Sequence, residues 1–78
     1  MTTYSFTAEL QEEAEDGRWS AWISVLPGCA AWGYSKEEAI EALRDAAEAY
    51  VADMVDAGEK IPKNAAAAAA GPFVTVRV

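Results

Sequence analysis

The sequence contains no histidine, the side chain that proteins use most often as a metal ligand or as a general base. A zinc site needs about four cysteine or histidine ligands, and this chain offers a single cysteine. The same shortage excludes the usual cysteine–histidine pair of covalent catalysis. We therefore expect no catalytic, cofactor-binding or metal-binding residues, and the chain is not predicted to be an enzyme.

The single cysteine excludes an internal disulfide bond, as expected of a protein in a reducing cytoplasm. It lies in the segment "VLPGCAAWGYSKEEA", directly after a Pro-Gly turn. Cys29 is either a reactive thiolate or a small buried residue beside that turn. Its apolar neighbours at the start of a strand favour burial.

Basic residues and long apolar runs are also scarce. Six lysines and arginines stand against 13 acidic residues, which gives a net charge of −7. Such a surface repels phosphate backbones, so no direct nucleic-acid binding is expected, whereas a basic protein partner would be compatible. No run is long enough to span a bilayer, and the N-terminus does not resemble a signal peptide. These features favour a cytoplasmic location without membrane contact.

What the sequence does contain is the pattern of one small domain, residues 1–78. Residues 4–10 alternate between apolar and polar, which predicts a strand with Tyr4, Phe6, Ala8 and Leu10 on its core side. Asp16-Gly17 predicts a hairpin. The return strand, residues 18–26, should bury Trp19, Ala21, Ile23 and Val25, and "CAAWGY" contains a short third strand that ends at Gly33.

A long helix follows. In "SKEEA", Ser35 and Glu38 have the spacing of a capping box, and Gly58 followed by Pro62 marks the end near residue 57. The expected apolar stripe consists of Ile40, Leu43, Ala47, Tyr50 and Met54. Residues 64–71 are interpreted as a connector. Residues 72–78 form a last strand with its valines on one face, so the predicted fold is an α+β two-layer sandwich of order β-β-β-α-β.

Carboxylates and exposed aromatics are the remaining candidates for a site. The acidic cluster Glu9, Glu12, Glu13, Glu15 and Asp16 could bind Mg²⁺ or Ca²⁺, but its spacing matches no known cation loop, and a solvated hairpin tip is favoured. Trp22 breaks the alternation of its strand, and Trp32 and Tyr34 end the next one. These three aromatics are the candidate partner-binding residues, because tryptophan and tyrosine often anchor protein interfaces. The alternative is that Trp22 packs against the connector.

Taken together, several marks resemble the N-terminal domain of the HicB family, antitoxins of type II toxin–antitoxin systems. They are the hairpin glycine Gly17, the "LPGC" turn, Gly33, "SKEEA" and "GEKIP" after the helix. The resemblance covers residues 4–62 well and the tail weakly. It implies a fold like a truncated RNase H without the catalytic carboxylates. It also implies a small basic partner, a HicA-like mRNA interferase whose catalytic surface the antitoxin covers.

Longer family members carry a C-terminal DNA-binding segment, whereas this sequence stops at Val78, so operator binding is in doubt for this chain unless the sequence is part of a longer protein. Two functions remain open: a HicB-like antitoxin that neutralises its toxin, or an orphan oligomeric or ligand-binding module of the same fold. An RNase H-like nuclease is a remote third. The last strand would leave an unpaired edge, which predicts a homodimer or higher oligomer.

Overall fold

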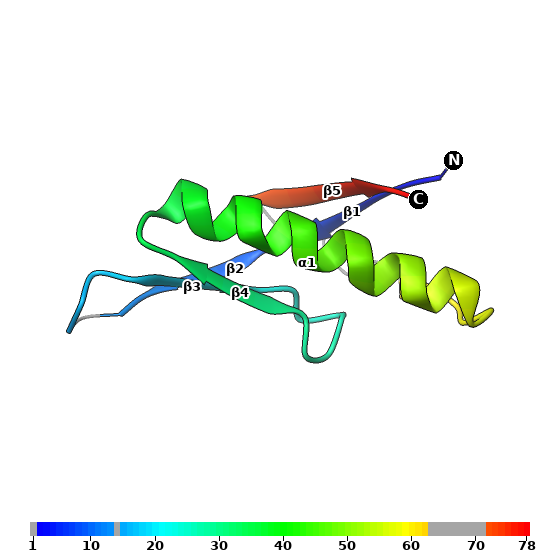
Figure 1. Ribbon diagram of the computed structural model, residues 1–78, viewed down its shortest axis with the longest axis horizontal. Coiled ribbons are helices and arrows are strands. Elements are labelled where there is room, and N and C mark those ends of the chain that lie inside the picture. Colours follow the sequence, from blue (N-terminus) through cyan, green and yellow to red (C-terminus); the bar gives the residue numbers. More distant parts are fainter. Residues whose placement is uncertain (1, 14, 63–71) are drawn as a thin grey trace.

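The computed structural model describes residues 2–13, 15–62 and 72–78, and these form one helix packed across five strands (Figure 1). The strands are β1 (Thr3–Thr7), β2 (Glu9–Glu12), β3 (Trp19–Trp22), β4 (Ala30–Gly33) and β5 (Phe73–Arg77), and the helix α1 spans Lys36–Asp56. The α+β class is confirmed. The predicted connector at 64–71 lies outside the described residues.

The first predicted strand is divided in two at Ala8. β1 pairs antiparallel with β5, whereas β2 pairs with β3, which in turn pairs with β4. A strand exposes hydrogen-bonding groups along both of its edges, so consecutive residues can serve different neighbours. The expectation of one continuous strand is therefore wrong, because its two halves belong to different sheets.

The hydrophobic core lies between the strands and α1. Phe6, Ala21, Ile23, Val74 and Val76 are buried, as the alternation predicted. Their buried counterparts on the helix are Ala39, Leu43, Ala47 and Val51. The buried face of α1 is therefore rotated slightly from the apolar stripe that the sequence predicted. Three residues of that stripe, Ile40, Tyr50 and Met54, are half-buried at the border of the core.

The segment between β3 and β4 differs from the predicted long strand. Turn hydrogen bonds join Leu26 N–H to the Ile23 carbonyl (3.1 Å) and Cys29 N–H to the Leu26 carbonyl (2.9 Å). These turns interrupt the alternation, so Leu26 is fully buried and Val25 only half-buried. The thiol of Cys29 is buried as expected, and this burial raises its pKa.

Both ends of the helix lie where the sequence places them. The Ser35 hydroxyl accepts a hydrogen bond from the Glu38 N–H at 3.1 Å, and Gly58 has the positive φ of 72° that suits a glycine after a helix. The Glu38 carboxylate accepts from the N–H of Tyr34, one residue before the cap, instead of from Ser35. The expected reciprocal capping box is thus shifted by one residue.

Candidate partner-binding face

The candidate site lies on the face of the β2–β3–β4 sheet that is turned away from α1. Trp22 lies between Glu9 and Ala30 in the strand register, and Trp32 lies beside Ser20. Ala21, one residue from both Ser20 and Trp22, is buried on the opposite face under the helix. We call the outward side of Trp22, Trp32 and Tyr34 the aromatic face.

Two of these aromatics are exposed and in mutual contact. The side chain of Trp32 is 52% exposed and that of Tyr34 is 70% exposed. Their rings meet edge-to-face, with centroids 5.3 Å apart and an interplanar angle of 88°. Trp22 lies on the same face, but its side chain is partly buried. It therefore exposes less surface to a partner than the sequence suggested.

Arg18 extends the aromatic pair toward the hairpin. Its guanidinium lies 5.3 Å from the ring centroid of Trp32 and donates a 2.7 Å hydrogen bond to the Asp16 carboxylate. The backbone N–H of Arg18 donates to the same carboxylate at 3.1 Å. This backbone bond, supported by the arginine side chain, lowers the pKa of Asp16. The order of contacts is therefore Asp16, Arg18, Trp32 and Tyr34.

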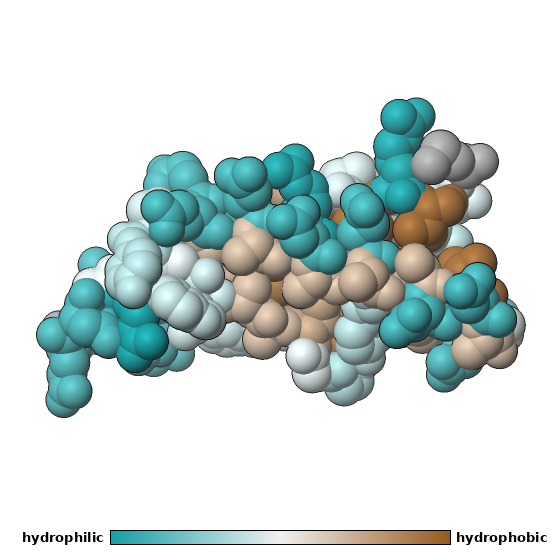
Figure 2. Space-filling view, in the orientation of Figure 1, coloured by the Kyte–Doolittle hydropathy of each residue, from teal (hydrophilic) through white to brown (hydrophobic). Residues whose placement is uncertain are grey.

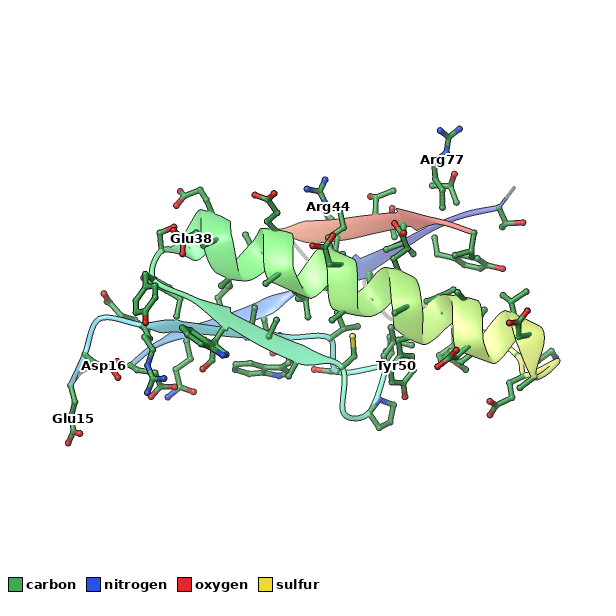
Figure 3. The ribbon with its side chains drawn as sticks, in the orientation of Figure 1. Glu15, Asp16, Glu38, Arg44, Tyr50 and Arg77 are labelled. Carbon is green, nitrogen blue, oxygen red and sulfur yellow. The ribbon has the colours of Figure 1, made fainter. Side chains whose placement is uncertain are left out.

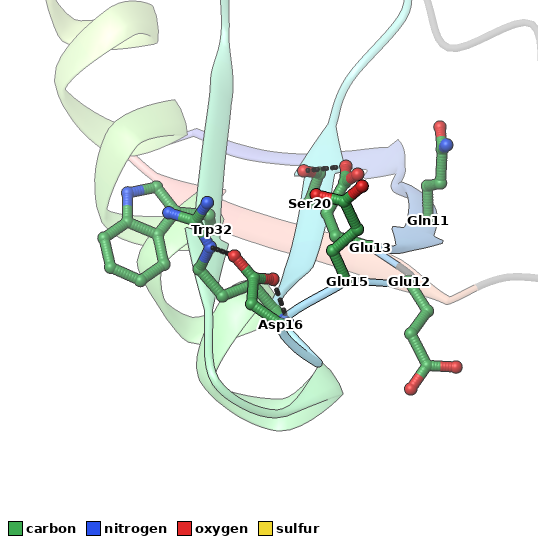
Figure 4. A pocket seen from close by; sticks show the side chains of 8 residues that line it. Gln11, Glu12, Glu13, Glu15, Asp16, Ser20 and Trp32 are labelled. Carbon is green, nitrogen blue, oxygen red and sulfur yellow. Dashed lines mark hydrogen bonds and ion pairs between the residues drawn. The ribbon is translucent and has the colours of Figure 1, made fainter.

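A shallow depression of about 560 Å³ lies between this row and the hairpin (Figure 4). We call it the acidic hollow. Its lining consists of Gln11, Glu12, Glu13, Glu15, Asp16, Arg18, Ser20 and Trp32. Figure 4 shows Trp32 on one side and the glutamates on the other, with the Ser20 hydroxyl donating to Glu13 at 3.0 Å. The hollow thus combines a flat aromatic ring with several carboxylates, a combination suited to a cationic, partly apolar protein surface.

Hydrophilic and hydrophobic residues are segregated on the visible side of the molecule. Figure 2 shows hydrophilic residues at the hairpin and along one side of the helix, with a paler, more hydrophobic band between them. Within the described residues no group of three or more Cys, Asp or Glu side chains is arranged to hold a metal ion. The carboxylates at the hairpin do concentrate negative charge around the acidic hollow.

Sequence reasoning missed Arg18 as part of the site. An arginine next to a hairpin glycine carries no motif, and its position over Trp32 arises only when β3 and β4 pair. It also missed Phe73, which is 50% exposed on β5 at the far edge of the fold. The available signal was its position beside Val74 in an alternating strand, which turns Phe73 outward.

Comparison with known proteins agrees with this architecture. Residues 6–71 match the family model described as "HicB_like antitoxin of bacterial toxin-antitoxin system". The "UPF0150 protein ssr1765" of Synechocystis sp. is 33% identical over 60 residues, covering 77% of this chain and 75% of that protein. The "UPF0150 protein Ta0767" of Thermoplasma acidophilum is 36% identical over 50 residues, covering 64% of this chain and 72% of that protein.

Two solved structures share the fold. The N-terminal domain of the Burkholderia pseudomallei antitoxin HicB superposes with a TM-score of 0.68 at 19% identity, covering 95% of this chain and 96% of that domain. The longer B. pseudomallei HicB structure gives a TM-score of 0.67 at 17% identity; it covers all of this chain, which spans 64% of the longer protein. The match over residues 6–71, together with the relatives, shows that this chain belongs to the HicB-like antitoxin family of toxin–antitoxin systems.

Proposed function

We propose that this protein is an antitoxin that neutralises a small, basic HicA-like mRNA interferase by covering the toxin's active surface. The observation that carries the proposal is the family match over residues 6–71 in a chain of net charge −7. A type II antitoxin acts as a protein that binds a protein, so the proposed role is non-enzymatic. The proposed antitoxin role also implies a cytoplasmic location, because a toxin that cleaves mRNA must be inhibited in the cytoplasm. Within the described part of the chain, no helix is both long and apolar enough to cross a membrane.

The aromatic face with its acidic hollow is the proposed contact surface. Trp32 and Tyr34 offer rigid, exposed rings of the kind that dominate binding energy at interfaces. The carboxylates around them attract a basic partner and accelerate encounter, and they disfavour direct contact with nucleic acid. We also propose that the fold is a truncated form of the RNase H fold, as the family resemblance implies.

The toxin is first identified by isolating the tagged protein from its host after nuclease treatment, followed by mass spectrometry. The purified candidate is then assayed in cell-free translation with increasing amounts of the antitoxin. We expect translation to be restored near stoichiometric amounts. A toxin that remains active in excess antitoxin would refute the proposal, and recovery of the protein alone would favour the orphan oligomeric module.

The position of the interface is tested with Trp32→Ala. If Trp32 is an anchor, its removal weakens toxin binding by about 30-fold or more. Val55→Ala is the control, because Val55 is 48% exposed near the C-terminal end of α1, away from the aromatic face. Equal affinities of the two variants would remove the aromatic face from the proposal while leaving neutralisation itself intact.

A further inference from the structure

Within the described residues, one edge of β5 has no neighbouring strand. Thr2 and Val78 exchange backbone hydrogen bonds of 2.7 and 3.0 Å, which fixes the ladder between β1 and β5. Since antiparallel ladders alternate, the backbone groups of Val74 and Val76 face β1, and those of Phe73, Thr75 and Arg77 face the other way. Among residues 2–13, 15–62 and 72–78, no backbone hydrogen bond is made to these three outward-facing residues.

This open edge is short and carries one charged residue, Arg77, but it lacks the stronger protections. Soluble proteins usually interrupt an exposed edge with proline, a bulge or inward-pointing charge. β5 has none of these within its five residues, Phe73–Arg77. Its side chains toward solvent are a half-exposed phenylalanine, a threonine and one arginine. The edge is thus competent to pair with another strand.

A groove lies beside the edge, between β5 and the first half of α1. It has a volume of about 420 Å³, and we call it the edge groove. Its lining consists of Glu37, Ile40, Glu41, Arg44, Phe73, Val74 and Thr75. Figure 3 shows Arg44 extending from the side of the helix next to β5, and Arg77 at the end of that strand. Apolar side chains therefore adjoin the unpaired backbone, with both charge signs around them.

We propose that a second copy of this chain occupies this edge, with the two β5 strands paired antiparallel about a twofold axis at Thr75. In this register each outward-facing N–H and C=O group finds a partner, because Thr75 meets its own copy and Phe73 meets Arg77. The Phe73–Arg77 pairs also place a guanidinium beside an aromatic ring on the solvent side of the sheet. The edge is self-complementary.

The local charges beside β5 are compatible with a second copy as the occupant. Glu41 and Arg44 lie one turn apart on the groove side of α1, so a twofold axis brings each glutamate toward the arginine of the other copy. The lining of the edge groove carries both signs, with Glu37 and Glu41 beside Arg44, so the same mixed surface of a second copy can complement it despite the net charge of −7 on each chain. The aromatic face belongs to β3, β4 and the residue after β4, and it is separate from the edge of β5, so the proposal is independent of toxin binding.

The test compares Thr75→Pro with Thr75→Val in the full chain. Both variants lose the 2.9 Å hydrogen bond between the hydroxyls of Thr75 and Ser5. Only proline also removes the outward N–H, and an edge strand tolerates proline where that N–H does not pair internally. Sedimentation should give twice the chain mass of 8.3 kDa for the wild type and for Thr75→Val, and a monomer for Thr75→Pro. Circular dichroism verifies that Thr75→Pro is folded.

Hydrogen exchange of the wild-type protein provides a readout that needs no variant. The Thr75 amide has no acceptor within the described chain, so it should be protected only in the dimer, increasingly with protein concentration. A monomer at all concentrations, a dimer that survives in folded Thr75→Pro, or a Thr75 amide that exchanges freely in the dimer would each overturn the proposal. Protection that appears only after addition of a toxin would overturn it as well, by assigning the edge to the toxin.

Discussion

The phenolic hydroxyl of Tyr50 on α1 donates a 2.7 Å hydrogen bond to the carbonyl oxygen of Pro27, in the turn before Cys29. This bond joins the second half of the helix to the segment between β3 and β4. Figure 3 shows Tyr50 reaching from the helix toward that turn. The contact explains why Tyr50 is half-buried at the border of the core, where its ring packs and its hydroxyl remains paired.

Tyr50→Phe should therefore destabilise the fold by about 1 kcal/mol, because it leaves the Pro27 carbonyl without this donor. Urea denaturation followed by circular dichroism measures the change. Tyr34→Phe is the matched control: the Tyr34 ring is exposed at the end of β4, and its loss of a hydroxyl should change stability by less than about 0.5 kcal/mol. Equal effects of the two substitutions would show that the bond to Pro27 contributes nothing.

Ser35→Ala should cost about 1 kcal/mol of stability, because it removes the acceptor that pairs the Glu38 N–H in the first turn of α1. Ser35→Asp retains an acceptor and adds a favourable negative charge at the helix N-terminus, so it should be close to the wild type. Thermal unfolding of the three proteins provides the comparison. A loss of stability in the aspartate variant as large as in the alanine variant would contradict the capping role.

Gly33→Ala should be more damaging than substitution of a glycine in open space. A Cβ at residue 33 would lie 2.6 Å from the Ala39 nitrogen and 2.6 Å from the Glu38 Cβ, so β4 and the helix would have to separate. Overpacking of this kind costs about 1–3 kcal/mol. Denaturant unfolding measures the cost.

Gly58→Ala is the control for that experiment, since a Cβ there meets no atom within 4 Å but the residue has a φ of 72°. Its penalty is purely conformational, about 1 kcal/mol. A Gly33→Ala variant as stable as the wild type would contradict the close approach of β4 to α1 at this residue.

Cys29 should react slowly with iodoacetamide in the folded protein and rapidly after denaturation. Burial raises its pKa above the ordinary value of 9.0, so the nucleophilic thiolate is scarce near neutral pH. Rapid labelling of the folded protein would restore the interpretation of Cys29 as a reactive thiol. Mass spectrometry at timed intervals measures both rates.

The same shift predicts a dependence of stability on pH. Above pH 9.0 the unfolded chain releases the thiol proton while the folded chain retains it, so stability is full below that value and declines as pH rises toward the folded-state pKa. Cys29→Ala should remove this component of the alkaline decline. The comparison requires unfolding curves of both proteins across the alkaline range.

The sequence by itself determined the local features of this protein. The ends of α1 follow from Ser35 and Gly58, and the buried faces of the strands follow from alternation, because caps, turns and periodicity depend on residues close together in the chain. The candidate partner-binding aromatics were also found locally, since Trp22 departs from its strand's pattern. The composition also fixes the absence of histidine, the most common general base and metal ligand in proteins.

Only the tertiary structure decided which segments meet. It divided the first strand at Ala8, brought β5 back to β1, selected Val51 for the core and joined Tyr50 to Pro27. It also placed Arg18 over Trp32 and, among the described residues, left the outer edge of β5 unpaired. Each of these depends on contacts between residues distant in sequence, whose free energy is set by packing and pairing geometry that no local pattern records.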